Sequence, residues 1–110
     1  LEYIDCNPIE NLALAPNCCL KIEQLNHPGD GFGYRLECSG TTISYISDRE
    51  HIPGKDDQNI LKLMQNANLA IYDSMYTEDE FSQKQGWGHS TWQEGLRLAK
   101  MAKTKKLAFY

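Results

Sequence analysis

Three titratable residues lie where predicted strands end or a helix begins, and their side chains could bind a metal ion or transfer a proton. His27 precedes a Pro-Gly turn, Asp48 ends an apolar stretch, and His89 comes directly before a predicted helix. In open α/β sheets, side chains converge at strand ends, and backbone N–H groups at helix starts face anions. Imidazole and carboxylate groups are ligands that zinc and related metals accept. We therefore expect these three side chains to share one cleft.

Each of these residues also has a purely structural explanation. A histidine before proline is commonly a turn residue, and an aspartate after a strand commonly caps or turns the chain. His89 could simply shape the loop between Gly88 and the capping residue Ser90. Residue spacing alone does not decide between a metal site and three ordinary turns.

The elements that must position these residues follow from periodicity and turn chemistry. Residues 1–17 are expected to be a loop-rich lead-in, with a short strand possible over 1–4, because prolines interrupt regular structure. Alternation predicts a half-buried strand over residues 18–25 and an antiparallel hairpin of strands 32–38 and 42–47. The cluster of turn residues at 27–31 separates the first two of these strands.

The second half of the chain alternates helices with strands. Asp56 or Asp57 is expected to cap a helix with one apolar face, followed by a buried strand over residues 69–72. Thr77 and Glu80 fit a capping box for a short helical segment over 77–83. A final helix beginning near Ser90 or Thr91 precedes a strand over 107–110, and its apolar residues recur at Trp92, Leu96, Ala99 and Ala102. The predicted fold class is α/β, with antiparallel strands followed by parallel β-α-β units.

Composition is that of an ordinary globular domain. The 110 residues are 41% hydrophobic and 24% charged with a net charge of −4, which argues against a dedicated nucleic-acid surface. We expect one domain over residues 1–110, without a membrane segment or signal peptide, in the cytoplasm. The four cysteines lack zinc-ribbon spacing, so buried reduced thiols are expected; a structural zinc module is a weaker alternative. They are Cys6, Cys18, Cys19 and Cys38.

Five short runs, in order, resemble the second half of metallo-β-lactamase-fold phosphodiesterases, a group that includes ribonuclease Z. The resemblance covers nearly everything from residue 21 onward, and the Gly-His-Ser-Thr run before a helix is its most specific part. The runs are Leu25-Asn26-His27-Pro28-Gly29, Gly33-Tyr34-Arg35-Leu36-Glu37, Ile46-Ser47-Asp48, Ile71-Tyr72-Asp73 and Gly88-His89-Ser90-Thr91.

The resemblance implies a role for each matched residue. Asp48 is similar to a carboxylate that bridges two metal ions, and His27 to a residue near the metal site or a ligand. His89 is similar to a histidine that protonates the leaving group or stabilises phosphoryl oxygens. Asp73 stands where these endonucleases have a glutamate that orients that histidine. Arg49 stands where the family usually has a small hydroxyl residue.

The resemblance also implies a fold and a cofactor. The chain is expected to be the C-terminal half of an αββα metallo-β-lactamase fold, acting on small-molecule or nucleic-acid phosphodiesters with two divalent ions. Zinc is the expected metal, and manganese is the alternative. The family's His-x-His-x-Asp-His run is missing here, and so is a further histidine after residues 107–110. A site with so few ligands is expected to bind a metal pair weakly.

Two functional hypotheses therefore remain from the sequence. One is a metal-dependent hydrolase represented by its C-terminal part, and the other is a non-catalytic interaction domain that retains half of the fold. Because each half of such a fold covers the apolar face of the other, this half alone is expected to self-associate.

Overall fold

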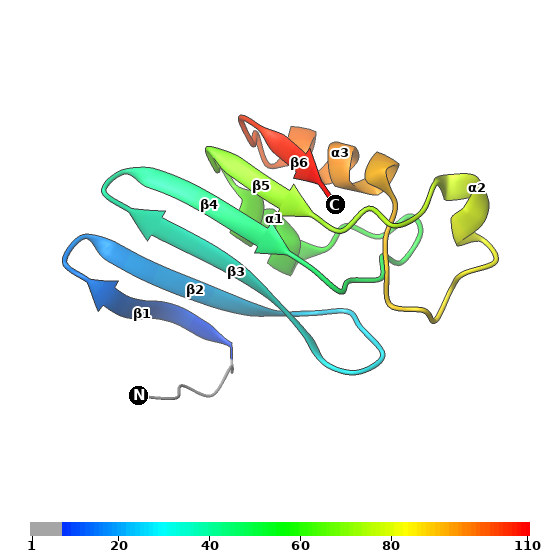
Figure 1. The fold of residues 1–110 in the computed structure, drawn as a ribbon, viewed down its shortest axis with the longest axis horizontal. Coiled ribbons are helices and arrows are strands. Elements are labelled where there is room, and N and C mark those ends of the chain that lie inside the picture. The colour runs from blue at the N-terminus through cyan, green and yellow to red at the C-terminus, as the bar shows by residue number, and fades with distance from the viewer. Residues whose placement is uncertain (1–7) are drawn as a thin grey trace.

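The computed structural model describes residues 8–110, which form one six-stranded sheet and three helices (Figure 1). The strands are hydrogen-bonded in the order in which they occur along the chain. The expected strand over residues 1–4 lies outside the described residues. The strands are β1 (Ile9–Ala15), β2 (Cys18–Leu25), β3 (Gly31–Cys38), β4 (Thr41–Ile46), β5 (Leu69–Tyr72) and β6 (Leu107–Phe109), and the helices are α1 (Gln58–Met64), α2 (Glu78–Phe81) and α3 (Trp92–Met101).

The sheet changes from antiparallel to parallel pairing at β4. Strands β1 to β4 are joined by hairpins, whereas β4, β5 and β6 run parallel to one another. Parallel neighbours need a crossover, and α1 and α3 supply the two crossovers. This arrangement confirms the predicted α/β class, with antiparallel strands followed by β-α-β units.

The helix caps lie among those that the sequence predicts, and the structure selects Asp57 over Asp56 and Thr91 over Ser90. The Asp57 side chain accepts the N–H groups of Asn59 and Ile60 at the start of α1. Thr77 and Glu80 form a complete capping box on α2, and the Thr91 hydroxyl accepts the Glu94 N–H at the start of α3. These bonds satisfy N–H groups that have no partner within the helix, which is why the helices begin at these residues.

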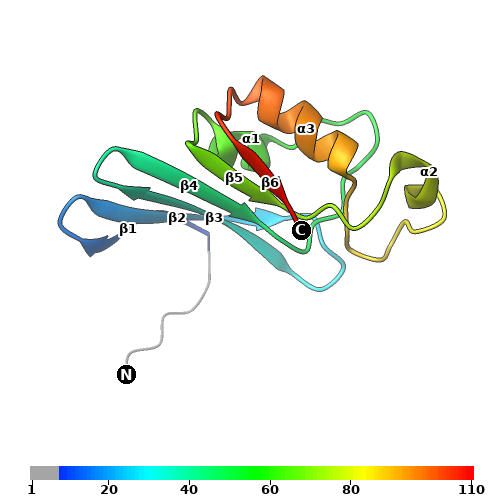
Figure 2. The same ribbon diagram turned by 45° about the horizontal axis from the view of Figure 1, so that its top comes forward.

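Helices α1 and α3 lie on the same face of the sheet and cover its buried side (Figure 2). On β4, Ser44 and Ile46 are buried beneath this layer, whereas Ile43 and Tyr45 point to the open face and are 37% and 39% exposed. The chain thus buries one side of its sheet and leaves apolar side chains on the other.

The expected helical face of α3 is only partly right. Ala99 and Ala102 are buried with Leu98, but Trp92 and Leu96 are 43% and 36% exposed. Gly95 takes the position closest to the sheet, because a Cβ there would lie 2.6 Å from a ring atom of Tyr72. The absence of a side chain lets the helix approach the sheet, which turns Trp92 and Leu96 outward.

Two expectations for the N-terminal part are wrong. The loop-rich lead-in contains β1, because Pro16 and Asn17 form a tight turn that returns the chain into β2, with Asn17 at a positive φ of 60°. Cys18 and Cys38 form a disulfide instead of remaining reduced, since the β2–β3 register places them directly opposite one another. Cys19 is a half-buried free thiol. None of the helices described is long and apolar enough to cross a membrane.

Candidate functional site

The candidate site lies at one edge of the sheet, where four chain segments meet. Asp48 follows β4 and Asp73 follows β5, and because these strands run parallel, both residues leave the sheet at the same edge. Since β2 is antiparallel to β3, and β3 to β4, the turn that contains His27 lies at this edge too. The Asp73 N–H donates to the Ile46 carbonyl at 2.9 Å, which fixes the two aspartate segments side by side.

A histidine–carboxylate pair forms the inner part of this site. His89 Nδ1 lies 2.7 Å from Asp73 Oδ2, and the second carboxylate oxygen of Asp73 accepts the Met75 N–H at 3.3 Å. Asp73 is only 3% exposed, whereas the His89 side chain is 25% exposed. An ionised carboxylate only accepts hydrogen bonds, so Nδ1 carries the proton and Nε2 remains as the atom that can exchange one.

Asp48 completes a group of three potential metal ligands with this pair. One ligand atom from each of Asp48, Asp73 and His89 lies within 4.8 Å of the others. Asp48 is exposed and adopts a positive φ of 47°, a conformation that aspartate tolerates better than most residues. Its carbonyl lies so close to β3 that a Cβ on Gly31 would be 2.7 Å from it. The glycine therefore permits the close approach of the two segments.

This donor set fits a single divalent ion. Carboxylate and imidazole groups are donors that zinc accepts, and the Asp48 carboxylate faces the hollow, whereas Asp73 and His89 are hydrogen-bonded to one another. Two ions would need more donors than residues 8–110 bring to this edge of the sheet.

His27 lies beside this group but does not belong to it. Its Nδ1 accepts the Gly29 N–H at 3.0 Å, and its ring packs against Gly88, where an added Cβ would be 2.3 Å from Nε2. The structure thus brings Asp48, Asp73 and His89 together and places His27 against the loop that carries His89. In this arrangement its ring shapes the loop.

The start of α3 follows His89, but not all of its backbone N–H groups are free to bind a ligand at the site. The Trp92 N–H donates to the Tyr76 carbonyl at 3.3 Å, and the Glu94 N–H donates to the Thr91 hydroxyl at 3.2 Å. Two N–H groups of the first helical turn are therefore already occupied.

A hollow of about 190 Å3 opens between these residues, and part of its lining was not foreseen from the sequence. Met75 is 57% exposed, and Tyr110 reaches the hollow from the end of β6. Burial raises the pKa of the Tyr110 hydroxyl, as do its neighbours Tyr45 and Asp73. A signal for Tyr110 was present, because a residue that follows a third parallel strand must reach the same edge as Asp48 and Asp73. The lining consists of Asp48, Asp73, Ser74, Met75, His89 and Tyr110.

Comparisons with known proteins identify relatives of this fold. A family model described as a β-lactamase superfamily domain matches residues 6–110. The short form of human tRNase Z superposes with a TM-score of 0.74 at 23% identity, over 90% of this chain and 37% of that chain. The metallo-β-lactamase fold protein YhfI from Bacillus subtilis gives a TM-score of 0.78 at 22% identity, over 96% and 41% of the two chains.

A third solved structure, a diphosphatase from the PhnP family, gives a TM-score of 0.65 at 17% identity, over 98% of this chain and 36% of that chain. This chain therefore spans about two fifths of the length of the solved chains that it matches. No curated protein sequence gives a significant match.

Proposed function

Because this chain belongs to the family of β-lactamase superfamily domains, we propose that it forms the C-terminal part of a metal-dependent hydrolase that cleaves phosphodiester bonds. Members of this superfamily generally bind divalent metal ions. The observation that carries the proposal is the convergence of Asp48, Asp73 and His89 at the carboxyl edge of β4 and β5. Two carboxylates and an imidazole in one hollow are the groups that a metal-assisted hydrolysis uses.

Each side chain has a distinct chemical task in this proposal. Divalent ions, when bound, would lower the pKa of a coordinated water and neutralise charge on the phosphoryl oxygens. Asp48 would hold the metal, since its carboxylate is exposed to the hollow. Both oxygens of Asp73 already accept hydrogen bonds, from Met75 and from His89, so this residue would orient the imidazole. His89 would then deliver a proton from Nε2 to the leaving oxygen.

The remaining ligands of a second ion would come from the rest of the fold. The solved relatives are more than twice the length of this chain, and the open face of the sheet here is apolar. A second layer packed on that face would bury Ile43 and Tyr45 and bring further donors to the same edge. Zinc suits these donors, and manganese is the alternative. The tRNase among the neighbours supports a nucleic-acid phosphodiester, and the diphosphatase supports a substrate that contains a diphosphate.

The experiment combines metal titration with hydrolysis of bis-p-nitrophenyl phosphate by the intact protein. Calorimetric titration with Zn²⁺ and Mn²⁺ should show binding that weakens in Asp48→Ala. His89→Ala should keep the metal and lose about 100-fold or more in kcat, because general acid catalysis typically contributes that much. Asp79→Ala, an exposed carboxylate on α2, is the matched control and should behave like the parent.

The two hypotheses give opposite results. A protein that does not bind metal and does not hydrolyse the ester would be a non-catalytic interaction domain. Hydrolysis that survives both Asp48→Ala and His89→Ala would place the chemistry elsewhere and end the proposal.

A further inference from the structure

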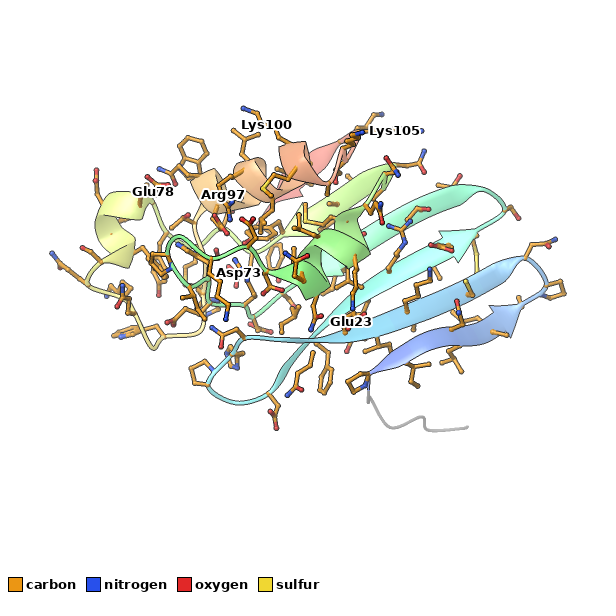
Figure 3. The ribbon with its side chains drawn as sticks, turned by 180° about the vertical axis from the view of Figure 1, so that it is seen from behind. Glu23, Asp73, Glu78, Arg97, Lys100 and Lys105 are labelled. Atoms are coloured by element: carbon orange, nitrogen blue, oxygen red, sulfur yellow. A yellow bond between two sulfur atoms is a disulfide. The ribbon has the colours of Figure 1, made fainter. Side chains whose placement is uncertain are left out.

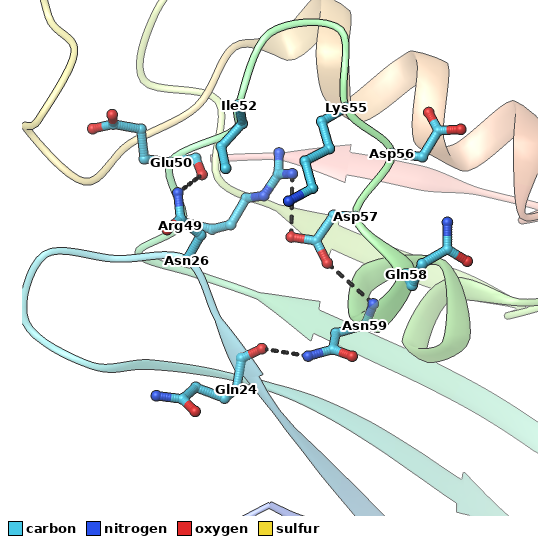
Figure 4. A pocket seen from close by; sticks show the side chains of 10 residues that line it. All are labelled: Gln24, Asn26, Arg49, Glu50, Ile52, Lys55, Asp56, Asp57, Gln58 and Asn59. Carbon is cyan, nitrogen blue, oxygen red and sulfur yellow. Dashed lines mark hydrogen bonds and ion pairs between the residues drawn. The ribbon is translucent and has the colours of Figure 1, made fainter.

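Residues 48–51 follow β4 and send successive side chains to different parts of the site. Asp48 faces the hollow, while the guanidinium of Arg49 turns inward. The Glu50 side chain points away from that guanidinium (Figure 4). His51 is buried, and its Nδ1 lies within hydrogen-bond distance of Ser90 Oγ. This short segment forms hydrogen bonds with the segments that carry His27, Asp73 and His89.

The Glu50 carboxylate holds the loop before His89. It accepts the Gly86 N–H on both oxygens, at 2.8 and 2.7 Å, and the Gly88 N–H at 2.9 Å. Gly86 and Gly88 have positive φ angles of 87° and 84°, so the loop turns its N–H groups inward at both positions. Hydrogen bonds from backbone N–H groups to a carboxylate are stronger than those between neutral groups.

The backbone of Glu50 also holds the turn that contains His27. The Glu50 N–H donates to the Asn26 carbonyl at 2.8 Å, and the Asn26 side-chain amide donates to the Glu50 carbonyl at 2.8 Å (Figure 4). Because the His27 ring lies against Gly88, the turn and the loop support one another through Glu50.

A buried network fixes the same loop from its inner side. Arg49 is 1% exposed and donates to the Tyr72 hydroxyl at 2.7 Å. That hydroxyl lies 3.1 Å from Ser90 Oγ, which lies 2.9 Å from His51 Nδ1. Tyr72 and Ser90 are the chain neighbours of Asp73 and His89, so the network ties together the backbones that carry the histidine–carboxylate pair.

Charged groups surround Arg49 and balance its burial. Asp57 lies 3.3 Å and Glu94 3.7 Å from its guanidinium, and Glu94 is itself paired with Arg97 on the same helix. Arg49 stands where the resemblance implies a small hydroxyl residue, so this chain fills the space behind the site with an arginine network.

We propose that Glu50 is a positioning residue that sets His89 against Asp73, with Arg49 fixing the same loop from behind. This inference rests on the proposed function, because it assigns the hydrogen bonds of Glu50 to the Gly86–Gly88 loop a role in proton transfer by His89. A loop released from Glu50 would let the imidazole drift, and a misplacement of about 1 Å can cost roughly 100-fold in rate.

The test compares Glu50→Ala and Glu50→Gln with Glu78→Ala in the intact protein. Glu78 is an exposed glutamate on α2 (Figure 3) and serves as the matched control. One measurement is the NMR resonance of the His89 Nδ1 proton, which reports its hydrogen bond to Asp73 without any need for activity. The others are hydrogen exchange of the Gly86 and Gly88 amides, and kcat and KM for bis-p-nitrophenyl phosphate.

Glu50→Ala should accelerate exchange at both glycines, remove the Nδ1 resonance and lower kcat by about 10- to 100-fold with little change in KM. Glu50→Gln should show smaller changes in amide exchange, in the Nδ1 resonance and in kcat, because its amide oxygen can still accept one N–H. A kcat in Glu50→Ala equal to that of the parent would overturn the proposal, and so would an unchanged Nδ1 resonance. If the parent hydrolyses nothing, the proposed function fails, and the Nδ1 resonance alone decides whether Glu50 positions His89.

Discussion

Replacing Gly88 with alanine tests the placement of His27 against the loop before His89. Gly88 has a φ of 84°, and an added Cβ would lie 2.3 Å from His27 Nε2 and 2.5 Å from Cδ2. Gly86 provides a matched control, because its φ is 87° and a Cβ there would meet nothing within 4 Å. Both glycines donate their N–H groups to Glu50, so the two substitutions differ in the contact with His27.

The loss of stability caused by left-handed backbone should be the same at Gly86 and Gly88. The loss caused by contact with the His27 ring should occur only at Gly88. An alanine forced into left-handed backbone loses about 1–2 kcal/mol of stability. At Gly88 the His27 ring must also move and give up its hydrogen bond from the Gly29 N–H, which adds about 1–2 kcal/mol. We therefore expect Gly88→Ala to lower the free energy of unfolding by about 2–4 kcal/mol, and Gly86→Ala by about half as much.

Urea denaturation followed by fluorescence measures these differences. A double-mutant cycle isolates the contact, since His27→Ala removes the ring and should recover about 1–2 kcal/mol in the Gly88→Ala background. Equal destabilisation by Gly86→Ala and Gly88→Ala, with no recovery on removing His27, would refute the packing of His27 on Gly88.

Three further predictions concern the disulfide, the buried residue His51 and the open face of the sheet. Reducing the disulfide between Cys18 and Cys38, which are 20 residues apart, should lower the free energy of unfolding by about 3 kcal/mol, whereas Cys19→Ala should not mimic this loss. Burial lowers the pKa of the His51 imidazole below its ordinary value of about 6.5, with Arg49 adding to this effect and Glu94 opposing it. As the pH falls, His51 therefore takes up a proton in the unfolded chain before it does so in the folded one. The free energy of unfolding, measured by urea titration, should decrease as the pH drops from 7.5 to 5.5. An equally steep decrease in His51→Gln would contradict this role of His51. The apolar open face should make the isolated 110-residue chain dimerise in sedimentation equilibrium, and Ile43→Lys should weaken the dimer; a monomer at all concentrations would contradict self-association.

The features that sequence alone determined are those encoded by short-range chemistry. The Thr77–Glu80 capping box acts over three residues, so it could be recognised without tertiary information, and the cap of the last helix could be narrowed to Ser90 or Thr91. Alternation over residues 18–25, 32–38 and 42–47 predicted three strands, and helices placed between later strands predicted parallel pairing. These local rules also placed His27, Asp48 and His89 at the ends of elements, whereas Asp73 was identified only through the resemblance.

Tertiary structure decided every feature that depends on which segments become neighbours. Cys18 meets Cys38 only through the register of β2 and β3. Nothing in the sequence around Arg49 indicates that this arginine is buried. Its buried charge is stabilised by Asp57, Tyr72 and Glu94, which come from three different parts of the chain. The ring of His27 turns to Gly88 because Glu50 draws the turn and the loop together. Such placements depend on long-range packing and charge compensation, for which residue spacing along the chain carries no signal.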